Sequence, residues 1–214
     1  MNINIPSSLH EITLGQYQHY VKVVRANSDD EGNIKEDKQD LVNQKCVEIF
    51  CDLEGEEYRQ LPMSIAENIV RQITEIFKED NPLYKRVTLL DGKKKIKLGF
   101  IPDLEEISIG EYIDLENTLW DVETLHQAMA VLYRPISMSI GQRYEIAKYT
   151  ADQQYVTLMK AMPLSAALGA QVFFYNLGNE LLNDITHSLM EEESLTHLAR
   201  TSEKNGDGIA TSTP

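Results

Sequence analysis

The sequence predicts a mainly α fold of the α+β class, made of two similar three-helix halves with a β-hairpin at their junction. Three observations predict it: a segment that occurs twice, the same helix-start signal in both copies, and a hairpin signal between them. The halves are expected over about residues 1–84 and 97–190, joined by a hairpin at 85–100. Together they form one predicted globular domain, 1–190, and the polar residues 191–214 are predicted to be a disordered tail.

The repeat consists of two pairs of matching segments. Residues 5–17 read IPSSLHEITLGQY and residues 101–112 read IPDLEEISIGEY, which match with one gap after the proline. Further along, LPMSIA at 61–66 matches MPLSAA at 162–167. The order is the same and the offset similar in both pairs, so a duplicated unit of roughly 95–100 residues is predicted.

Both copies carry the signal for a helix start. In the first copy, Thr13 is expected to cap a helix that runs to about Arg25. Gln16 lies three residues after this cap, where a capping box has Glu or Gln. Ser108 and Glu111 have the same spacing at the matching positions of the second copy. The shared spacing predicts a helix from each of the two caps.

The second helix of each half follows a connection of very different length. Residues 26–40 are polar and are predicted to be a mobile loop, whereas the second half has only a few residues at this point. Apolar residues at helical spacing then predict helices over 41–53 and 122–133. The latter is expected to end near its last residue, because Pro135 disfavours helical geometry in the residue before it.

The third helix of each half is predicted to begin with a proline in its first turn, where the missing N–H costs nothing. The expected apolar stripes are Ile65, Ile69, Ile73 and Phe77 in the first copy, and Ala166, Ala170, Phe174 and Gly178 in the second. The second of these helices is apolar on other faces too, and is therefore expected at the centre of the fold.

A hairpin is predicted between the halves, because two extended runs flank Asp91-Gly92. Residues 2–5 alternate as a short strand does and are a candidate third strand of the same small sheet.

The composition is that of an acidic globular protein. The chain has 214 residues, 42% of them hydrophobic, and a net charge of −14. The seven charged residues after position 190 contribute −3, which leaves −11 for the rest. This balance argues against nucleic-acid binding, since phosphate contacts need a surplus of Lys and Arg. The favoured interpretation is that the negative charge keeps the protein soluble. The alternative is that it allows docking on a basic partner.

No membrane helix, metal site or cofactor site is predicted. No run approaches the ~18 apolar residues of a membrane span. The N-terminal residues carry no secretory signal, so a cytoplasmic location is expected. Cys46 and Cys51 match no zinc or redox motif and are expected to be reduced packing residues. Ligand spacing is also lacking among the histidines, at positions 10, 19, 126, 187 and 197.

No catalytic residue is predicted either. The sequence has no glycine-rich phosphate loop, nucleophile elbow, His-Glu-x-x-His motif or calcium loop. Adjacent carboxylates are not evidence of a glycosidase-type catalytic pair, because so acidic a chain contains many of them. We therefore do not expect an enzyme.

Three features have alternative interpretations. Arg134 could bind a carboxylate on a partner protein. The favoured interpretation is that it caps the carbonyl groups at the end of the preceding helix. Residues 191–193, three glutamates, open a tail that is a partner-docking segment or, as favoured, simply solvated. A basic cluster could contact nucleic acid or an acidic partner. The favoured interpretation is that it protects a strand edge against unwanted pairing. The cluster consists of Lys85, Arg86, Lys93, Lys94, Lys95 and Lys97.

Three stretches resemble small proteins of the structural-gene modules of tailed bacteriophages. They are KLGFIPDLEEISIGEYIDL at 97–115, AMAVLYRPI at 128–136 and MPLSAALGAQVFFYNLG at 162–178. The resemblance implies a morphogenesis protein, with a tail assembly chaperone or a minor virion component as specific roles. Tail assembly chaperones are small, acidic, helical and non-catalytic, and they hold an aggregation-prone tail protein until assembly.

The sequence thus leads to two functional expectations. The first is a non-catalytic phage morphogenesis protein that contacts phage tail or head proteins, in the host cytoplasm or in the virion. The alternative is an acidic regulatory or inhibitory module that binds a basic groove on a host protein. The sequence does not determine the partner or the oligomeric state.

Overall fold

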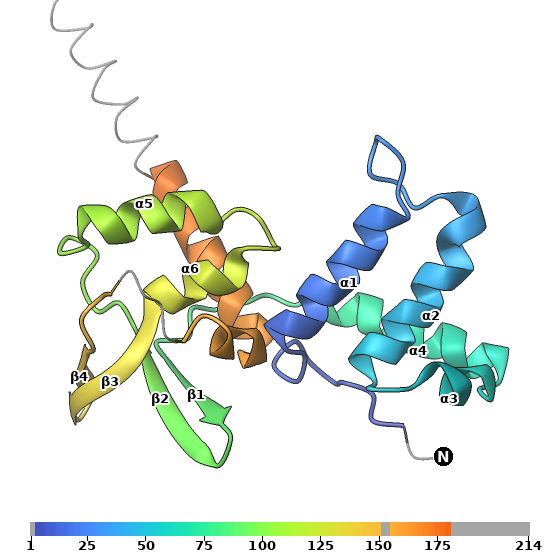
Figure 1. The fold of residues 1–214 in the computed structure, drawn as a ribbon, viewed down its shortest axis with the longest axis horizontal. Coiled ribbons are helices and arrows are strands. Elements are labelled where there is room, and N and C mark those ends of the chain that lie inside the picture. The colour runs from blue at the N-terminus through green and yellow to red at the C-terminus, as the bar shows by residue number, and fades with distance from the viewer. Residues whose placement is uncertain (1–2, 151–154, 181–214) are drawn as a thin grey trace, which may run out of the picture. The chain divides into compact units, whose positions relative to one another are not determined.

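The computed structural model describes residues 3–150 and 155–180 and has an α+β architecture (Figure 1). The chain divides into two compact units, Met1–Val172 and Phe173–Pro214. Of the second unit, residues 173–180 are described; they are helical, and the rings of Phe173 and Phe174 meet edge to face. The predicted tail at 191–214 and the domain end at 190 lie outside the described residues. All labelled elements belong to the first unit.

The first group of elements is helical. α1 packs against α2, and α2 packs against α4 (Figure 1). The group consists of α1 (Leu14–Ala26), η1 (Glu36–Lys38), α2 (Gln39–Phe50), α3 (Gly55–Arg59) and α4 (Met63–Ile76).

The core of this group is mainly aliphatic and includes Phe50, which joins it to an aromatic cluster. Phe50 meets both Tyr20 and Phe77 edge to face, and Tyr17 stacks obliquely on Phe77. On α4 the predicted stripe is partly wrong: Ile65 is exposed, and the buried face is Ala66, Ile69, Ile73 and Ile76. The two middle residues of the predicted stripe, Ile69 and Ile73, are buried as expected, and Pro62 is the N-cap of the helix rather than part of its first turn.

The predicted loop at 26–40 is a turn closed on itself. Ser28 bridges Ile34, and the carboxylate of Asp29 accepts hydrogen bonds from the N–H groups of Glu31 and Asn33. Gly32 has a φ of +85°, a conformation that glycine adopts without strain. η1 then leads into α2, which begins two residues before the predicted start. The mobility of this segment stays a prediction.

The second group combines a sheet with helices. It consists of β1 (Arg86–Asp91), β2 (Lys94–Phe100), α5 (Ile109–Thr118), α6 (Leu125–Leu132), β3 (Tyr133–Ile140), β4 (Arg143–Ile146), η2 (Leu158–Ala161) and a helix that begins at residue 164. The four strands form an antiparallel sheet in the order β1-β2-β3-β4.

The hairpin predicted around Asp91-Gly92 is present as β1 and β2, but its neighbour in the sheet differs from the prediction. Residues 3–5, the described part of the candidate strand, are not in a strand. The third strand is instead β3, which follows α6 without a loop. Pro135 ends α6 at Leu132 as predicted and then lies inside β3, opposite Leu98. A proline favours extended geometry in the residue before it, which suits a strand as well as a loop.

The second core lies between α6, the sheet and the helix at 164–172. Its fully buried members include Leu98, Leu125, Met129, Leu132, Tyr133, Met159, Met162 and Leu164. Ala166 and Ala170 of the predicted stripe are fully buried, but Gly178 is exposed and Val172 is 47% exposed, so the prediction of a helix buried on all faces holds only for its first turns. Beside the two alanines, a Cβ on Gly169 would come within 2.2 Å of the carbonyl oxygen of Pro82. Glycine at this position therefore lets the segment before β1 cross the helix in close contact.

The two groups meet where two helices begin side by side. Thr13 and Pro163 form an antiparallel bridge. The N–H of Leu14 donates to the carbonyl of Met162 at 2.8 Å, and the N–H of Leu164 donates to the carbonyl of Ile12 at 2.7 Å. A first-turn N–H has no partner inside its own helix, so each helix here supplies the acceptor that the other lacks.

Both predicted capping boxes are present. Thr13 and Gln16 satisfy each other's N–H groups at the start of α1, and Ser108 and Glu111 do the same at the start of α5. These local signals were predicted correctly at both helix starts.

Candidate functional site

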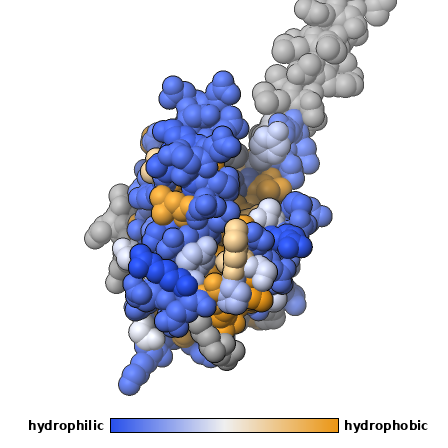
Figure 2. Space-filling model, turned by 90° about the vertical axis from the view of Figure 1, so that its right-hand side faces the viewer, coloured by the Kyte–Doolittle hydropathy of each residue, from blue (hydrophilic) through white to orange (hydrophobic). Residues whose placement is uncertain are grey.

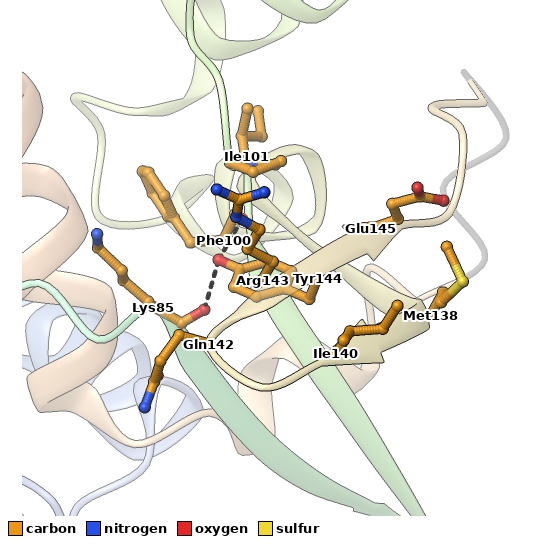
Figure 3. Close-up of a pocket in the computed structure, with 10 residues that line it drawn as sticks. Lys85, Phe100, Ile101, Met138, Ile140, Gln142, Arg143, Tyr144 and Glu145 are labelled. Carbon is orange, nitrogen blue, oxygen red and sulfur yellow. Dashed lines mark hydrogen bonds between the residues drawn. The ribbon is translucent and has the colours of Figure 1, made fainter.

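A surface hollow of about 620 Å³ lies where the two hairpins of the sheet meet (Figure 3). Its walls come from the end of β2 and the residues after it, from β3 and β4, and from the segment before β1. Met138 and Ile140 are 49% and 73% exposed, a large fraction for apolar side chains. The lining residues are Lys85, Phe100, Ile101, Pro102, Met138, Ile140, Gln142, Arg143, Tyr144 and Glu145.

Tyr144 shapes the hollow by fastening β4 onto the first hairpin. Its hydroxyl lies 2.8 Å from the carbonyl oxygen of Phe100 and 3.0 Å from that of Lys85 (Figure 3). Its ring covers Gly99, where a Cβ would lie 2.4 Å from a ring carbon. Burial raises the pKa of Tyr144, so the hydroxyl remains protonated and able to donate at neutral pH. A side chain at position 99 would force the hairpins apart.

Arg86 holds the same hairpin from its turn. Its guanidinium lies 5.0 Å from the centre of the Tyr144 ring and donates to the carbonyls of Gly141 and Gln142 at 3.2 and 3.0 Å. Gly141 has a φ of +59° in this two-residue turn. Arg86, predicted as part of a basic surface, is thus used to position the hollow.

The rest of the predicted basic cluster divides between the hollow and the first hairpin, where Lys93 lies in the turn and Lys94 begins β2 opposite Asp91. Lys85 lines the hollow, whereas Lys95 and Lys97 lie on the exposed side of β2, across from Leu90 and Thr88. β3 pairs with β2 only over residues 98–100, so it does not cover the edge of β2 at 94–97. This placement suits protection of a strand edge, which stays a prediction. Within the described ranges, the five lysines of the cluster form no ion pair.

Arg134 does not cap the preceding helix, so the favoured prediction for it was wrong. Its guanidinium pairs with Glu111 at 2.8 Å, and both side chains are largely buried, at 13% and 7% exposed. Burial lowers the pKa of Arg134, and the Glu111 carboxylate opposes this shift. The Nε atom of Arg134 is buried without a hydrogen-bond partner. The carboxylate predicted for a partner thus comes from the start of α5 in the same chain.

The cysteines are buried and reduced, as predicted. Burial raises the pKa of Cys46 to about 12 and that of Cys51 to about 11, so both are protonated thiols at neutral pH. Over residues 3–150 and 155–180, no three His, Cys, Asp or Glu side chains gather in a way that could hold a metal ion. In the same ranges, no helix has the length and apolar character needed to cross a bilayer.

The chemistry that the hollow offers is that of binding. Met138 and Ile140 face solvent next to two cations, Lys85 and Arg143, and one carboxylate, Glu145. An apolar segment that carries an acidic residue would complement this lining.

Residues 136–146 are the part of this site that the sequence prediction missed. Apolar residues at every second position, Ile136, Met138 and Ile140, precede Gly141, and this pattern is typical of a hairpin.

Comparison of the chain with protein-family models, with curated proteins and with solved structures finds no match in any of the three.

Proposed function

We propose that this chain is a non-catalytic protein that acts by binding other proteins, and that the hollow between the hairpins is its principal contact. The observation that carries the proposal is the pair of exposed apolar side chains, Met138 and Ile140, on a hairpin fixed from below by Tyr144 and Arg86. A rigid hairpin presents such residues at little entropic cost on binding. The cations beside them favour an apolar segment with an acidic residue as the ligand.

The proposed setting is the assembly of a tailed bacteriophage. The resemblance of residues 97–115, 128–136 and 162–178 to phage structural-module proteins supports it. The specific roles proposed are a tail assembly chaperone or a minor virion component, with phage tail or head proteins as partners. In the first role, the hollow would hold an apolar segment of a tail protein until assembly.

Co-purification tests this proposal. The full chain is expressed with the tail and head proteins of its source, and capture is compared between the native chain and an Ile140→Asp variant. Capture is expected to fall at least tenfold in the variant, because the substitution removes an apolar contact and the new carboxylate repels the acidic residue expected on the ligand. Ile109→Asp, which changes another exposed apolar residue, is the matched control and is expected to capture normally. Equal capture by all three chains would contradict the role of the hollow.

A charge-based inhibitor is the second proposal, and one observation favours it. Residues 101–125 contain eight acidic residues and no basic one. Part of this charge is engaged inside the chain, since Arg25 pairs with Asp121 and Glu123. Binding that weakens steeply with salt and does not respond to Ile140→Asp would favour this function over the first.

We also propose that the two halves are copies of one ancestral unit. The matching segments at 5–17 and 101–112 support this, together with the capping boxes at corresponding positions. In addition, a short helix precedes each copy of the proline motif: α3 before 61–63 and η2 before 162–164. Superposition of 5–80 on 101–180 tests the duplication, and unrelated paths of the chain would contradict it.

A further inference from the structure

One contact in this chain has an unused counterpart. Within the chain, segment 12–14 of the first copy pairs with segment 162–164 of the second. In the repeat, 107–109 corresponds to 12–14, and 61–63 corresponds to 162–164. A second contact of the same kind, between 107–109 and 61–63, is therefore encoded by the sequence but not made within the chain.

The residues of the missing contact are exposed where their counterparts are buried. Leu14 and Leu164 are 0% exposed, whereas Ile109 and Met63, which correspond to them, are 81% and 76% exposed. Ile65 beside Met63 is exposed as well. Tyr112 and Ile113, on the same face of α5 as Ile109, are exposed too, and contiguous exposed apolar side chains mark interaction surfaces.

One backbone donor in each of these segments is also unpaired. In the part of the chain that the structure describes, neither the N–H of Ile109 nor that of Met63 donates a hydrogen bond. Each is the first N–H of its helix, as are those of Leu14 and Leu164. The two unpaired donors thus match the two donors that the internal contact satisfies.

We propose that the chain associates head to tail with further copies of itself, through segment 107–109 of one copy and segment 61–63 of the next. The pairing is antiparallel, with Ser108 opposite Pro62, as Thr13 lies opposite Pro163 within the chain. It extends between copies the contact that joins the two halves inside each copy. This inference rests on the duplication put forward under Proposed function, and not on the hollow between the hairpins.

The surface around 61–63 offers room for the incoming segment. A hollow of about 280 Å³ lies beside Met63, and its lining combines Tyr58, Leu61, Ala66 and Val70 with the polar or charged residues Asp40, Asn43, Arg59 and Glu67. The side of the molecule that carries α2, α3 and α4 is largely hydrophilic, with separate hydrophobic patches on it (Figure 2). Ile109 would enter this hollow as Leu14 enters the core within the chain.

Because the two surfaces differ, the contact is heterologous and leaves one free surface at each end of any open assembly. Such contacts build rings when the rotation between copies closes, and filaments when it does not. The proposal excludes a twofold dimer formed through one self-complementary patch. Mixing two variants, each with a different one of the two surfaces disrupted, therefore tests the proposal.

The first experiment uses Ile109→Asp and Met63→Asp in the full chain, with Leu90→Asp as a control at an exposed apolar residue elsewhere. Mass is measured by light scattering over increasing concentration. The native chain and the control are expected to exceed twice the monomer mass of 24.4 kDa, whereas each of the two variants alone stays monomeric. A mixture of the two variants is expected to form a 1:1 dimer and nothing larger, because each retains the surface that the other lacks. A monomeric native chain would overturn the proposal, and so would a mixture that remains monomeric.

A crosslink tests the register. The double variant Pro62→Cys/Ser108→Cys is expected to form disulfides between copies, since directly opposed residues in an antiparallel pair lie within disulfide distance. The native Cys46 and Cys51 are buried and do not compete. Crosslinked dimers and higher species are expected without reductant, and Ser108→Cys alone is expected to remain uncrosslinked. Efficient crosslinking of Ser108→Cys alone would overturn the head-to-tail arrangement.

The two proposals fail separately. Ile140→Asp is expected to self-associate normally while it loses the captured protein, and Ile109→Asp is expected to behave in the opposite way. Loss of self-association in Ile140→Asp would show that the contact uses the hollow instead, which also overturns the inference.

Discussion

The same sequence motif begins α1 and α5, and it has opposite fates in the two places. Both starts have a capping box with a glycine at the second helical position. At α1 the apolar residues Leu9, Ile12 and Leu14 are fully buried, whereas Ile109 at the start of α5 is 81% exposed. The local signal therefore determines where the helix begins, and the surrounding chain determines what the helix start is used for.

The side chain at the third helical position illustrates the difference. Gln16 donates to the carbonyl of Ile49 at the end of α2, and Glu111 pairs with Arg134 just after α6. Each ties the start of one helix to the end of the next. The amide reaches a carbonyl directly, while the carboxylate requires a cation, and this requirement explains the buried Arg134.

The largest effect is expected from truncating the two matching apolar residues. Leu14→Ala should lower the free energy of unfolding by about 2–5 kcal/mol, because it leaves a cavity in a fully buried site. Ile109→Ala should change it by less than about 0.5 kcal/mol in dilute monomer. Urea unfolding of both variants measures the contrast. Equal losses would mean that 107–109 is packed within the monomer.

Next in size is the effect of replacing the side chain at the third helical position. Glu111→Gln should cost about 3 kcal/mol, since it leaves the largely buried guanidinium of Arg134 without its carboxylate. Gln16→Ala removes neutral hydrogen bonds and should cost about 1 kcal/mol. The double variant Glu111→Gln/Arg134→Met should recover most of the loss of Glu111→Gln. If it does not, the ion pair is not the source of that loss.

A smaller effect of opposite sign is expected at the two glycines. A Cβ on Gly15 would lie 3.0 Å from the carbonyl oxygen of Lys160, whereas the nearest atom to a Cβ on Gly110 is 3.7 Å away, on Tyr149. Gly15→Ala should therefore destabilise by about 1 kcal/mol, and Gly110→Ala should stabilise by about 0.5 kcal/mol through helix propensity. Thermal unfolding of the two variants gives the signs, and a gain in both would show that Lys160 moves away without cost.

The smallest expected effect concerns pH. Gln18 on α1 is buried and hydrogen-bonds to His126 Nδ1, whereas its counterpart on α5, Ile113, is exposed. Burial, with help from Lys160 and Lys22, lowers the pKa of His126 below its ordinary 6.5. The unfolded chain then binds the extra proton, so this contribution to stability is present above about pH 6.5 and is lost as the pH falls below it. His126→Gln should reduce the slope of the free energy of unfolding against pH in this acidic range. An unchanged slope would show that the carboxylates cause the pH dependence instead.

The sequence was a good guide wherever the signal is local. Thr13 and Ser108 as caps, Pro135 as the end of α6, and the turn at Asp91-Gly92 each depend on a few neighbouring residues. The pairing of Glu111 with Arg134 and the burial of Ala66 and Ile76 on α4 depend on residues far along the chain, which a single sequence does not place.

The candidate site was missed for a different reason. The alternation of Ile136, Met138 and Ile140 was present in the sequence, but the proline at 135 led to the expectation of a break. What makes the hollow is the packing of Tyr144 on Gly99, between residues 45 positions apart, and no local pattern indicates it.

The interlocking of the first and last parts of the first unit has a consequence for synthesis on the ribosome. Leu14 completes its burial only against residues near Met162, and Gly169 must meet the carbonyl of Pro82. During synthesis, the apolar residues at the start of α1 therefore stay exposed to solvent until some 150 further residues have been made. Contacts of such sequence separation also slow folding after release. A nascent chain stalled before residue 160 should therefore be protease-sensitive around α1, and one stalled well after residue 172 should be protected there.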